Sequence, residues 1–352
     1  LISIIGNQKK NGQTRFNSIS LEENKNQIQI NNLELNQNFK ITDIDSIDVN
    51  FKNTKDLNNK ISLKKKNSNF FLEGDLLDAT KIINTIMDSD EQSITFFENL
   101  NSKIKIKIKK IYIDDVNYMN NLYGDISYIN NKLDNLKLKS IFPNKKEINL
   151  FIKTNNNFEV ETKLFSSYPK PLIKRYNFIR GFEEGYLEFY SSKKGNISNS
   201  TLIISDFKVK EVPILAKLLS LSSLQGIADL LTGEGIRFTD FEMNFSNQNS
   251  LTKIQEMYAI GPAVSVLMDG YIESKKLISL RGTLVPATTI NKTIASIPLL
   301  GKILIGDKTG EGVFGVSFKI KGPPKNLKTS VNPIKTLTPR FITRTLEKIK
   351  KN

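Results

Sequence analysis

Apolar and polar residues alternate over short stretches along most of this chain. The clearest stretch is residues 103–109, in which Lys and Ile alternate so that Ile104, Ile106 and Ile108 share one face. Apolar residues at every second position predict a β-strand with one face buried and the other in water. Ile111 and Ile113 follow on the opposite parity. We therefore expect a β-bulge at residues 109–110 that re-aims this strand.

The same alternation recurs in runs of about five to eight residues, and each run predicts a further strand. In the first 70 residues the apolar positions are spaced near period two between Asn-rich turns. Beyond them, strands are predicted at residues 123–129, 133–138, 147–152, 158–164, 185–190, 202–209, 238–245, 254–260, 264–272, 277–285 and 313–320. Asn, Gly and Pro favour turns, which we expect at Asn130-Asn131, Pro143-Asn144, residues 155–157 and residues 193–196.

Residues 213–232 depart from this rhythm because their apolar positions recur at helical spacing, as in Ile214, Leu218 and Leu221. Pro213 suits a first helical turn, and Gly233 suits the positive φ that ends a helix. The pattern predicts one apolar helix inserted into a β protein. Two interpretations carry about equal weight: a plug of the core, or a helix that contacts an apolar partner.

Two shorter helices are predicted, at residues 79–87 and in a tail at residues 339–350. We expect the fold to be mostly β with a few helices, an elongated antiparallel sheet curled into a groove. Residues 1–180 would supply groove-forming strands, and residues 181–352 would carry the inserted helix and the C-terminal helix. We expect one continuous elongated unit.

Composition narrows the chemistry. The 352 residues include no Cys and no His, which removes disulfides, thiolate metal sites and the commonest general base. The net charge is +15, but Lys alternates with Ile and occupies the solvent face of strands. No Trp is present and aromatic residues do not interleave with basic ones, so nucleic acid is not the expected partner.

No motif predicts catalysis. Residues 301–309 resemble a phosphate-binding loop but have Asp307 where Lys would follow the second Gly. Asp114-Asp115 and Glu183-Glu184 are neighbours that would point to opposite faces of a strand. Tyr258 and Tyr271 are interpreted as sheet aromatics. We therefore expect a protein that is not an enzyme, with no catalytic residue, cofactor or metal. No signal peptide or membrane span is visible, and because Leu1 is no initiator Met we expect the C-terminal part of a longer protein.

An ordered series of motifs in about residues 180–345 resembles a known family. The series comprises Val212–Ile227, Leu230–Phe238, Gly261-Pro262-Ala263, Leu280–Ala287, Ile297–Gly301, Gly310–Gly315, Val331-Asn332-Pro333 and Leu337-Thr338-Pro339. It resembles the C-terminal region of the large AsmA-like proteins of Gram-negative bacteria, the group that includes YhdP and is related to TamB. The resemblance implies an inner-membrane-anchored periplasmic protein, with its anchor upstream of this chain, that moves phospholipid toward the outer membrane.

On this basis the leading hypothesis is a non-enzymatic lipid-transfer segment whose inward side chains contact acyl chains. The residues expected to contact lipid are Ile104, Ile106, Ile108, Leu215, Leu218, Leu219, Leu224, Ile227, Ile297, Leu299, Leu300, Phe314, Val316 and Phe318. Arg340, Arg344 and Lys348 are expected to contact headgroups at a membrane surface. Two alternatives remain open: a scaffold that assists outer-membrane proteins, with outer-membrane or periplasmic protein partners, or a structural β protein.

Overall fold

The computed structural model describes most of the chain. Its described residues are 1–8, 12–83, 97–174, 180–210, 212–222, 229, 233–286, 315–324 and 326–334. Within them the chain is mostly β with short helices, as the alternation predicts. It divides into two compact units, Leu1–Tyr168 and Pro169–Asn352, called unit 1 and unit 2 below.

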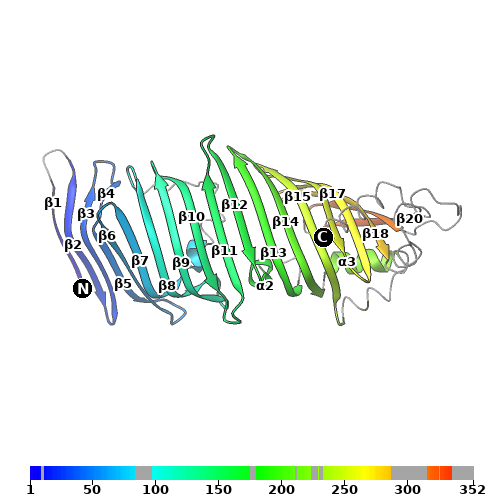
Figure 1. The fold of residues 1–352 in the computed structure, drawn as a ribbon, viewed down its shortest axis with the longest axis horizontal. Coiled ribbons are helices and arrows are strands. Elements are labelled where there is room, and N and C mark those ends of the chain that lie inside the picture. Colours follow the sequence, from blue (N-terminus) through cyan, green and yellow to red (C-terminus); the bar gives the residue numbers. More distant parts are fainter. Residues whose placement is uncertain are drawn as a thin grey trace. The chain divides into compact units, whose positions relative to one another are not determined.

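In unit 1, strands that follow one another along the chain lie next to one another in the sheet, with the short β4 set beside β3 (Figure 1). The described strands are β1 (Ile2–Gln8), β2 (Thr14–Glu23), β3 (Asn26–Leu35), β4 (Ile41–Asp43), β5 (Ser46–Lys52), β6 (Asn58–Lys66), β7 (Asn69–Asp78), β8 (Ser102–Tyr112), β9 (Tyr118–Ile129), β10 (Lys132–Ile141), β11 (Glu147–Thr154) and β12 (Glu159–Ser166).

The pairings in unit 1 are antiparallel, as predicted, with one exception among the described strands. Strands β7 and β8 run parallel, with Phe70 opposite Ile104 and Asp78 opposite Tyr112. Parallel neighbours need a long crossover connection, and residues 79–101 supply it. Helical backbone occupies residues 80–83, where the helix at 79–87 is predicted, and residues 84–87 lie outside the described part.

The turns form where Asn residues predict them. Asn130 and Asn131 join β9 to β10 with φ values of 49° and 63°, which identifies a two-residue type I′ turn. Asn155 holds the β11–β12 turn because its side-chain oxygen accepts hydrogen bonds from the backbone N–H groups of Asn157 and Glu159. Asn tolerates positive φ and bonds to its own backbone, so these turns follow from local chemistry.

The predicted switch of parity near residues 109–110 is present, but its form differs from a bulge. Ile108 lies opposite Leu122 and Ile111 lies opposite Met119, with no extra residue in either strand. Both Ile108 and Ile111 are nevertheless buried in one core cluster. Asn121, which faces this point on β9, has a φ of 53°. Both strands therefore change parity at the same level, and their register is preserved.

The described ends of the crossover pack against apolar residues of the unit 1 sheet. Ala79 packs with Ile106 and Ile108 in one core cluster, against which Ile83 also lies. Leu100, at the other end of the crossover, packs with Ile44 and Phe70 in a second cluster. The apolar positions of β8 thus lie in a core closed by the chain's own side chains.

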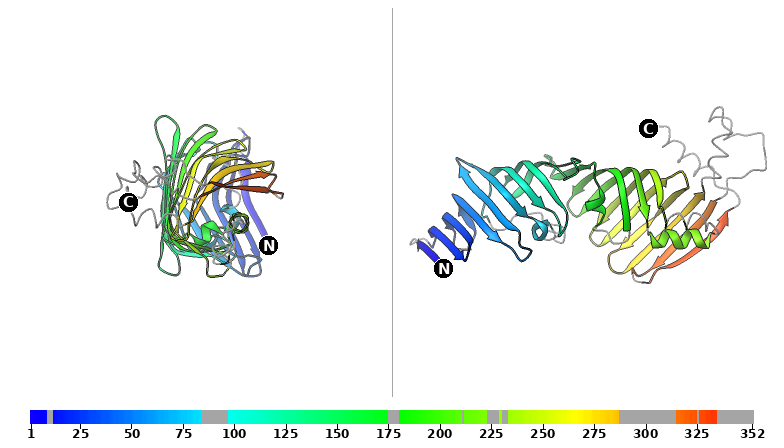
Figure 2. Two further views of the ribbon diagram at one scale, coloured as in Figure 1. Left: turned by 90° about the vertical axis from the view of Figure 1, so that its right-hand side faces the viewer. Right: turned by 90° about the horizontal axis from the view of Figure 1, so that it is seen from below.

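Unit 2 pairs its strands antiparallel in chain order from β13 to β20. The described strands are β13 (Arg180–Lys194), β14 (Ile197–Lys210), β15 (Ile236–Gln248), β16 (Leu251–Ile260), β17 (Val264–Glu273), β18 (Leu277–Pro286), β19 (Gly315–Gly322) and β20 (Lys328–Ile334). This sheet is strongly curved (Figure 2). Within the described residues, no pairing joins β20 back to β13.

Two helices belong to unit 2 in its described part, α2 (Lys170–Ile173) and α3 (Pro213–Leu221). Helix α3 begins at the predicted Pro213, contacts β20 and lies beside that orange strand in Figure 2. The prediction extended this helix to residue 232, but most of residues 223–232 lie outside the described part, as does the predicted tail helix. Among the helices that the structure describes, none combines the length and the apolar composition of a membrane span.

Candidate functional site

The sheet of unit 2 separates apolar from polar side chains because residues paired across neighbouring strands share a face. On its apolar face, side chains form rows that run across the strands. The first row, called the buried row, consists of Ile204, Phe241, Ala259, Val266, Leu284 and Val316. All of these except Phe241 are buried, and Leu284 and Val316 have no exposed surface.

A second row lies one pleat further along the strands and is more open. This methionine row consists of Leu202, Met243, Met257, Met268, Gly282, Phe318 and Val331, each opposite the next. It contains three of the five Met residues of the chain. Leu202 and the three Met side chains are half-buried, so they keep surface that a ligand can contact.

At Gly282 the Phe318 ring and the Leu267 backbone approach the methionine row closely. A Cβ atom on Gly282 would lie 2.5 Å from the ring of Phe318 and 2.3 Å from the carbonyl oxygen of Leu267. The Phe318 side chain, which is 3% exposed, therefore occupies the space that a side chain at position 282 would take. Glycine here permits a close approach of ring and backbone.

Buried aromatic rings fill the apolar face at the end where β15 begins. Phe207 stacks on Phe182 and on Phe238, with centroids 5.5 Å apart in both pairs. All three rings are buried. In α3, Leu218 and Leu219 are buried too, at 3% and 0% exposure. The apolar face thus runs from a filled aromatic end to a half-buried row of Met residues.

The opposite face of unit 2 is polar and internally paired. The Tyr258 hydroxyl donates a hydrogen bond of 2.7 Å to the Glu242 carboxylate. Burial, together with this negative neighbour, raises the pKa of Tyr258 well above its usual value. Arg281 bonds to Asp269 across β17 and β18 at 2.9 Å. The Tyr258–Glu242 hydrogen bond and the Arg281–Asp269 ion pair thus join neighbouring strands on the polar face.

The structure places the predicted lipid-contacting residues in different surroundings. Ile106 and Ile108 are buried in the core of unit 1, whereas Ile104 is half-buried beside it. In unit 2, Leu215 is half-buried, whereas Leu218, Leu219, Val316 and Phe318 are buried. Outside the described residues lie Leu224, Ile227, Ile297, Leu299, Leu300, Phe314, Arg340, Arg344 and Lys348.

The members of each adjacent acidic pair have separate partners. The prediction placed both pairs on strands, but Asp114 and Asp115 lie in the loop between β8 and β9. Glu184 forms an ion pair of 2.8 Å with Arg237, and Glu183 lies 3.6 Å from Lys210. In unit 1 the Asp114 carboxylate accepts hydrogen bonds from Asn117, whereas Asp115 pairs with Lys55. Residues 301–309, the segment resembling a phosphate loop, lie outside the described part.

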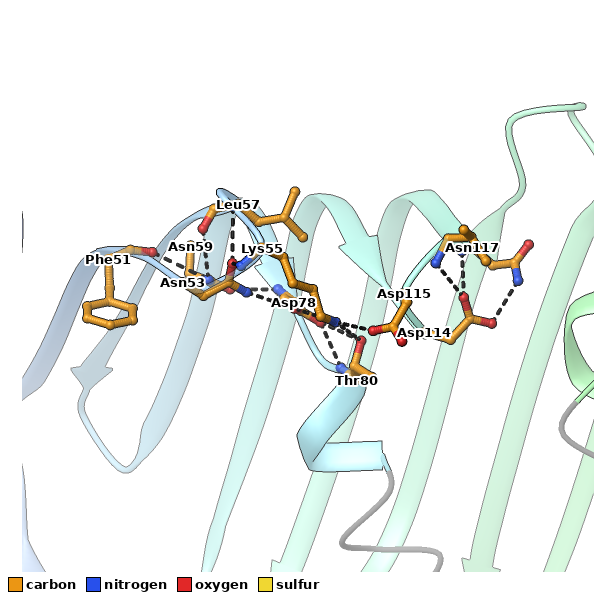
Figure 3. Close-up of polar contacts among 11 residues, drawn as sticks. Phe51, Asn53, Lys55, Leu57, Asn59, Asp78, Thr80, Asp114, Asp115 and Asn117 are labelled. Carbon is orange, nitrogen blue, oxygen red and sulfur yellow. Dashed lines mark hydrogen bonds and ion pairs between the residues drawn. The ribbon is translucent and has the colours of Figure 1, made fainter.

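A polar cluster around Asp78 fastens the start of the crossover in unit 1 (Figure 3). The Asp78 carboxylate accepts hydrogen bonds from the Thr80 backbone N–H, the Thr80 hydroxyl and the Asn53 side chain. Lys55 lies 3.2 Å from Asp78 and 2.7 Å from Asp115. Asp78 therefore caps residues 80–83 and ties them to the β5–β6 turn. The described residues contain no acidic group arranged to hold a metal ion.

Sequence reasoning missed the methionine row. Met257 and Ile254 share the apolar face although they are three residues apart, because Gln255 and Glu256 together occupy an irregular step in the β15–β16 register. The sequence signal that could have revealed the row is the distribution of Met, because three of the five Met fall on three consecutive strands.

Comparison with protein-family models, with curated proteins and with solved structures found no match for this chain.

Proposed function

We propose that this chain is a non-enzymatic lipid-transfer segment, the C-terminal region of an AsmA-like protein, and that the apolar face of unit 2 carries phospholipid acyl chains. The observation that carries this proposal is the methionine row. Its Met243, Met257 and Met268 side chains stay half-buried on an apolar face whose neighbouring row is almost fully buried. The family assignment is supported by the ordered motifs in the sequence.

The energetics of acyl chains favour such a surface. Hiding each CH₂ group from water contributes about 0.8 kcal/mol, so a chain of roughly 16 carbons gains on the order of 13 kcal/mol by full burial. Along a continuous apolar row, each part of the acyl chain exchanges contact with water for contact with an apolar side chain. Movement along it then needs no energy-coupling site, because each position resembles the next.

The dimensions of the row suit an extended alkyl chain. Neighbouring strands lie about 4.8 Å apart, so the step from Leu202 to Met268 crosses three strand spacings, about 14 Å. Along this distance every paired residue is apolar. We place the acyl chain perpendicular to the strands, against this row.

Methionine suits a surface that must accept chains of different shape. Its side chain is unbranched and polarizable, and it adapts to irregular ligands. Branched Ile or Val would present one fixed contour, because their χ1 is restricted. A row of three Met residues therefore favours sliding contact over tight binding of one ligand.

The finer features of the proposal concern the groove and the helix. We propose that the curved sheet of unit 2 forms the groove and that α3, with Leu218 and Leu219 buried, closes one end of it. The compartment implied by the resemblance is the periplasm, where the chain would be held by an anchor in another part of the protein. Phospholipid and a membrane surface are its proposed partners.

The test measures lipid that stays bound during purification. The 352-residue chain is expressed in a Gram-negative host and lipids are quantified by native mass spectrometry. A charge in the row, Met257→Asp, is expected to lower bound phospholipid at least tenfold, because an ionised carboxylate resists burial against alkyl groups. The matched control, Glu256→Gln, changes the adjacent residue. A lipid-free wild-type chain, or equal lipid in both variants, would refute the proposal.

A further inference from the structure

The polar face of unit 1 carries a lattice of lysine side chains over strands β8–β12. Cross-strand pairing places Lys105, Asp125, Lys137, Phe151 and Lys163 in one row. The adjacent row consists of Lys107, Tyr123, Lys139, Asn149 and Phe165. We call the five lysines of these two rows the lysine face. All five are exposed.

Within the part of the chain that the structure describes, none of these five lysines has an ion-pair partner. Asp125, which lies between Lys105 and Lys137, is taken by Lys103 at 3.3 Å. Two further acidic residues lie at the sides of the lysine face, Glu73 opposite Lys107 and Glu161 on β12. The Lys105 ammonium lies 5.5 Å from the Phe71 ring centroid. The positive charge of the lysine face is thus left for a partner outside the chain.

Lysine-rich composition alone does not explain this face. The equivalent polar face of unit 2 has acidic residues on β13–β17, including Glu188, Glu242, Glu256 and Asp269. Several of these are satisfied internally, as in the Tyr258–Glu242 and Arg281–Asp269 contacts. Lysines occur on the polar faces of both units, but on unit 2 they share the face with these acidic residues. The two rows of the lysine face contain five lysines and one carboxylate, that of Asp125, and this local excess of positive charge indicates a surface with a specific use.

The distances between the lysines indicate how the anionic groups of the partner are arranged. Lysines recur on every second strand, about 10 Å apart, and at every second residue of a strand, about 7 Å apart. Both spacings are close to the screening length of about 8 Å at physiological salt. A two-dimensional lattice of separate charges matches a plane of separate anions more closely than it matches a single chain of them.

The chemistry of the side chains favours lipid headgroups. All five cations are Lys, which acts as a hydrated point charge, whereas Arg binds phosphate in a fixed bidentate geometry. Tyr123 lies between Lys107 and Lys139 and is 54% exposed, and an amphipathic ring of this kind suits the headgroup level of a bilayer. We infer that the lysine face docks on an anionic phospholipid surface. This inference stands apart from lipid transfer, since it concerns the other face of the other unit.

The test uses the full 352-residue chain and two kinds of vesicle, phosphatidylcholine alone and an equal mixture with phosphatidylglycerol. The variant K105Q/K137Q/K139Q removes three charges from the lysine face. The matched variant K253Q/K319Q/K321Q removes three exposed lysines from the polar face of unit 2. Circular dichroism confirms that both variants fold. Each lysine near an anionic surface is worth about fivefold in binding constant, so the first variant is expected to lose about a hundredfold.

The expected pattern is binding of wild type to the mixed vesicles only, weakened by salt, with the loss confined to the first variant. Absence of vesicle binding, or equal loss in the two variants, would overturn the inference. Single-stranded RNA serves as the competing ligand. Binding of RNA that depends on the three lysines, with vesicle binding unchanged between the variants, would assign this face to nucleic acid and would also overturn it.

Discussion

Met257 lies directly opposite Met268 on the neighbouring strand, and both side chains are half-buried on the apolar face of unit 2. Met243 faces Met257 from the other side. This pairing places three adaptable side chains in one continuous strip across β15, β16 and β17. The proposed lipid-transfer activity depends on this strip being accessible and compliant, and several predictions test its consequences and those of the surrounding fold.

Stiffening the methionine row is expected to make it selective. In the variant M243I/M257I/M268I, branched side chains with restricted χ1 replace flexible ones of similar volume. We expect cis-unsaturated lipid to fall about three- to tenfold relative to saturated lipid, which corresponds to about 1 kcal/mol of lost fit. Lipid composition by mass spectrometry measures the ratio. An unchanged ratio would show that Met flexibility is irrelevant to loading.

The core of unit 1 is expected to respond to depth of burial within a single strand. Ile108 is 1% exposed and lies inside a core cluster, whereas Ile104 is half-buried at its margin. Ile108→Ala is expected to lower the free energy of unfolding by about 3–4 kcal/mol, and Ile104→Ala by about 1–2 kcal/mol. Urea denaturation measures both. Equal losses would indicate that the crossover does not close the core over Ile108.

Gly282 is expected to tolerate no side chain. In Gly282→Ala the new Cβ meets both Phe318 and the Leu267 carbonyl oxygen, so the free energy of unfolding is expected to fall by about 2–3 kcal/mol. Phe318→Leu relieves only the ring contact. We therefore expect a coupling of about 1 kcal/mol between the two changes in a double-mutant cycle. Additive losses would mean that the ring does not occupy this space.

Acid is expected to remove the stabilisation that Asp78 provides. Burial opposes ionisation of this carboxyl, but hydrogen bonds from Thr80 and the Lys55 charge outweigh it and lower the pKa of Asp78. Because the folded pKa lies below the unfolded one, this stabilisation is present above about pH 4 and disappears as pH falls through the folded pKa. Asp78→Asn is expected to cost about 1–2 kcal/mol at pH 7 and little at low pH.

The matched control is Asp56→Asn, because the Asp56 side chain pairs with Lys52 at 2.6 Å but is 85% exposed. Exposed ion pairs contribute little, so this change is expected to alter the free energy of unfolding by less than about 0.5 kcal/mol. Denaturation curves collected across the acid range provide the comparison. A cost for Asp78→Asn that is independent of pH would contradict the role assigned to its charge.

The sequence predicts the local features of this fold more completely than the pairing between them. Alternation in residues 103–109 is enough to place β8 and to orient Ile104, Ile106 and Ile108. Asn130 and Asn131 are enough to place a turn. The parallel pairing of β7 with β8 is not encoded in either strand, because it depends on where the crossover at residues 79–101 returns the chain.

The candidate site shows the same limit. Helical spacing predicts the start of α3 at Pro213, and period-two spacing places Val316 and Phe318 on the apolar face. Whether a side chain on that face is buried or exposed depends on which cross-strand row it joins, and the row is set by strand pairing in the folded sheet. Met257 in particular could not be assigned, since the irregular register at Gln255 and Glu256 shifts the parity of β16 relative to β15.

Site-specific photo-crosslinking at the methionine row tests the central proposal most directly. A photoreactive residue is placed at Met257, on the apolar face, or at Glu256, on the polar face of the same strand, in cells that synthesise labelled phospholipid. The proposal predicts labelled lipid on the chain crosslinked at position 257 and none at position 256. Lipid at both positions or at neither, with the protein folded and abundant, would contradict it.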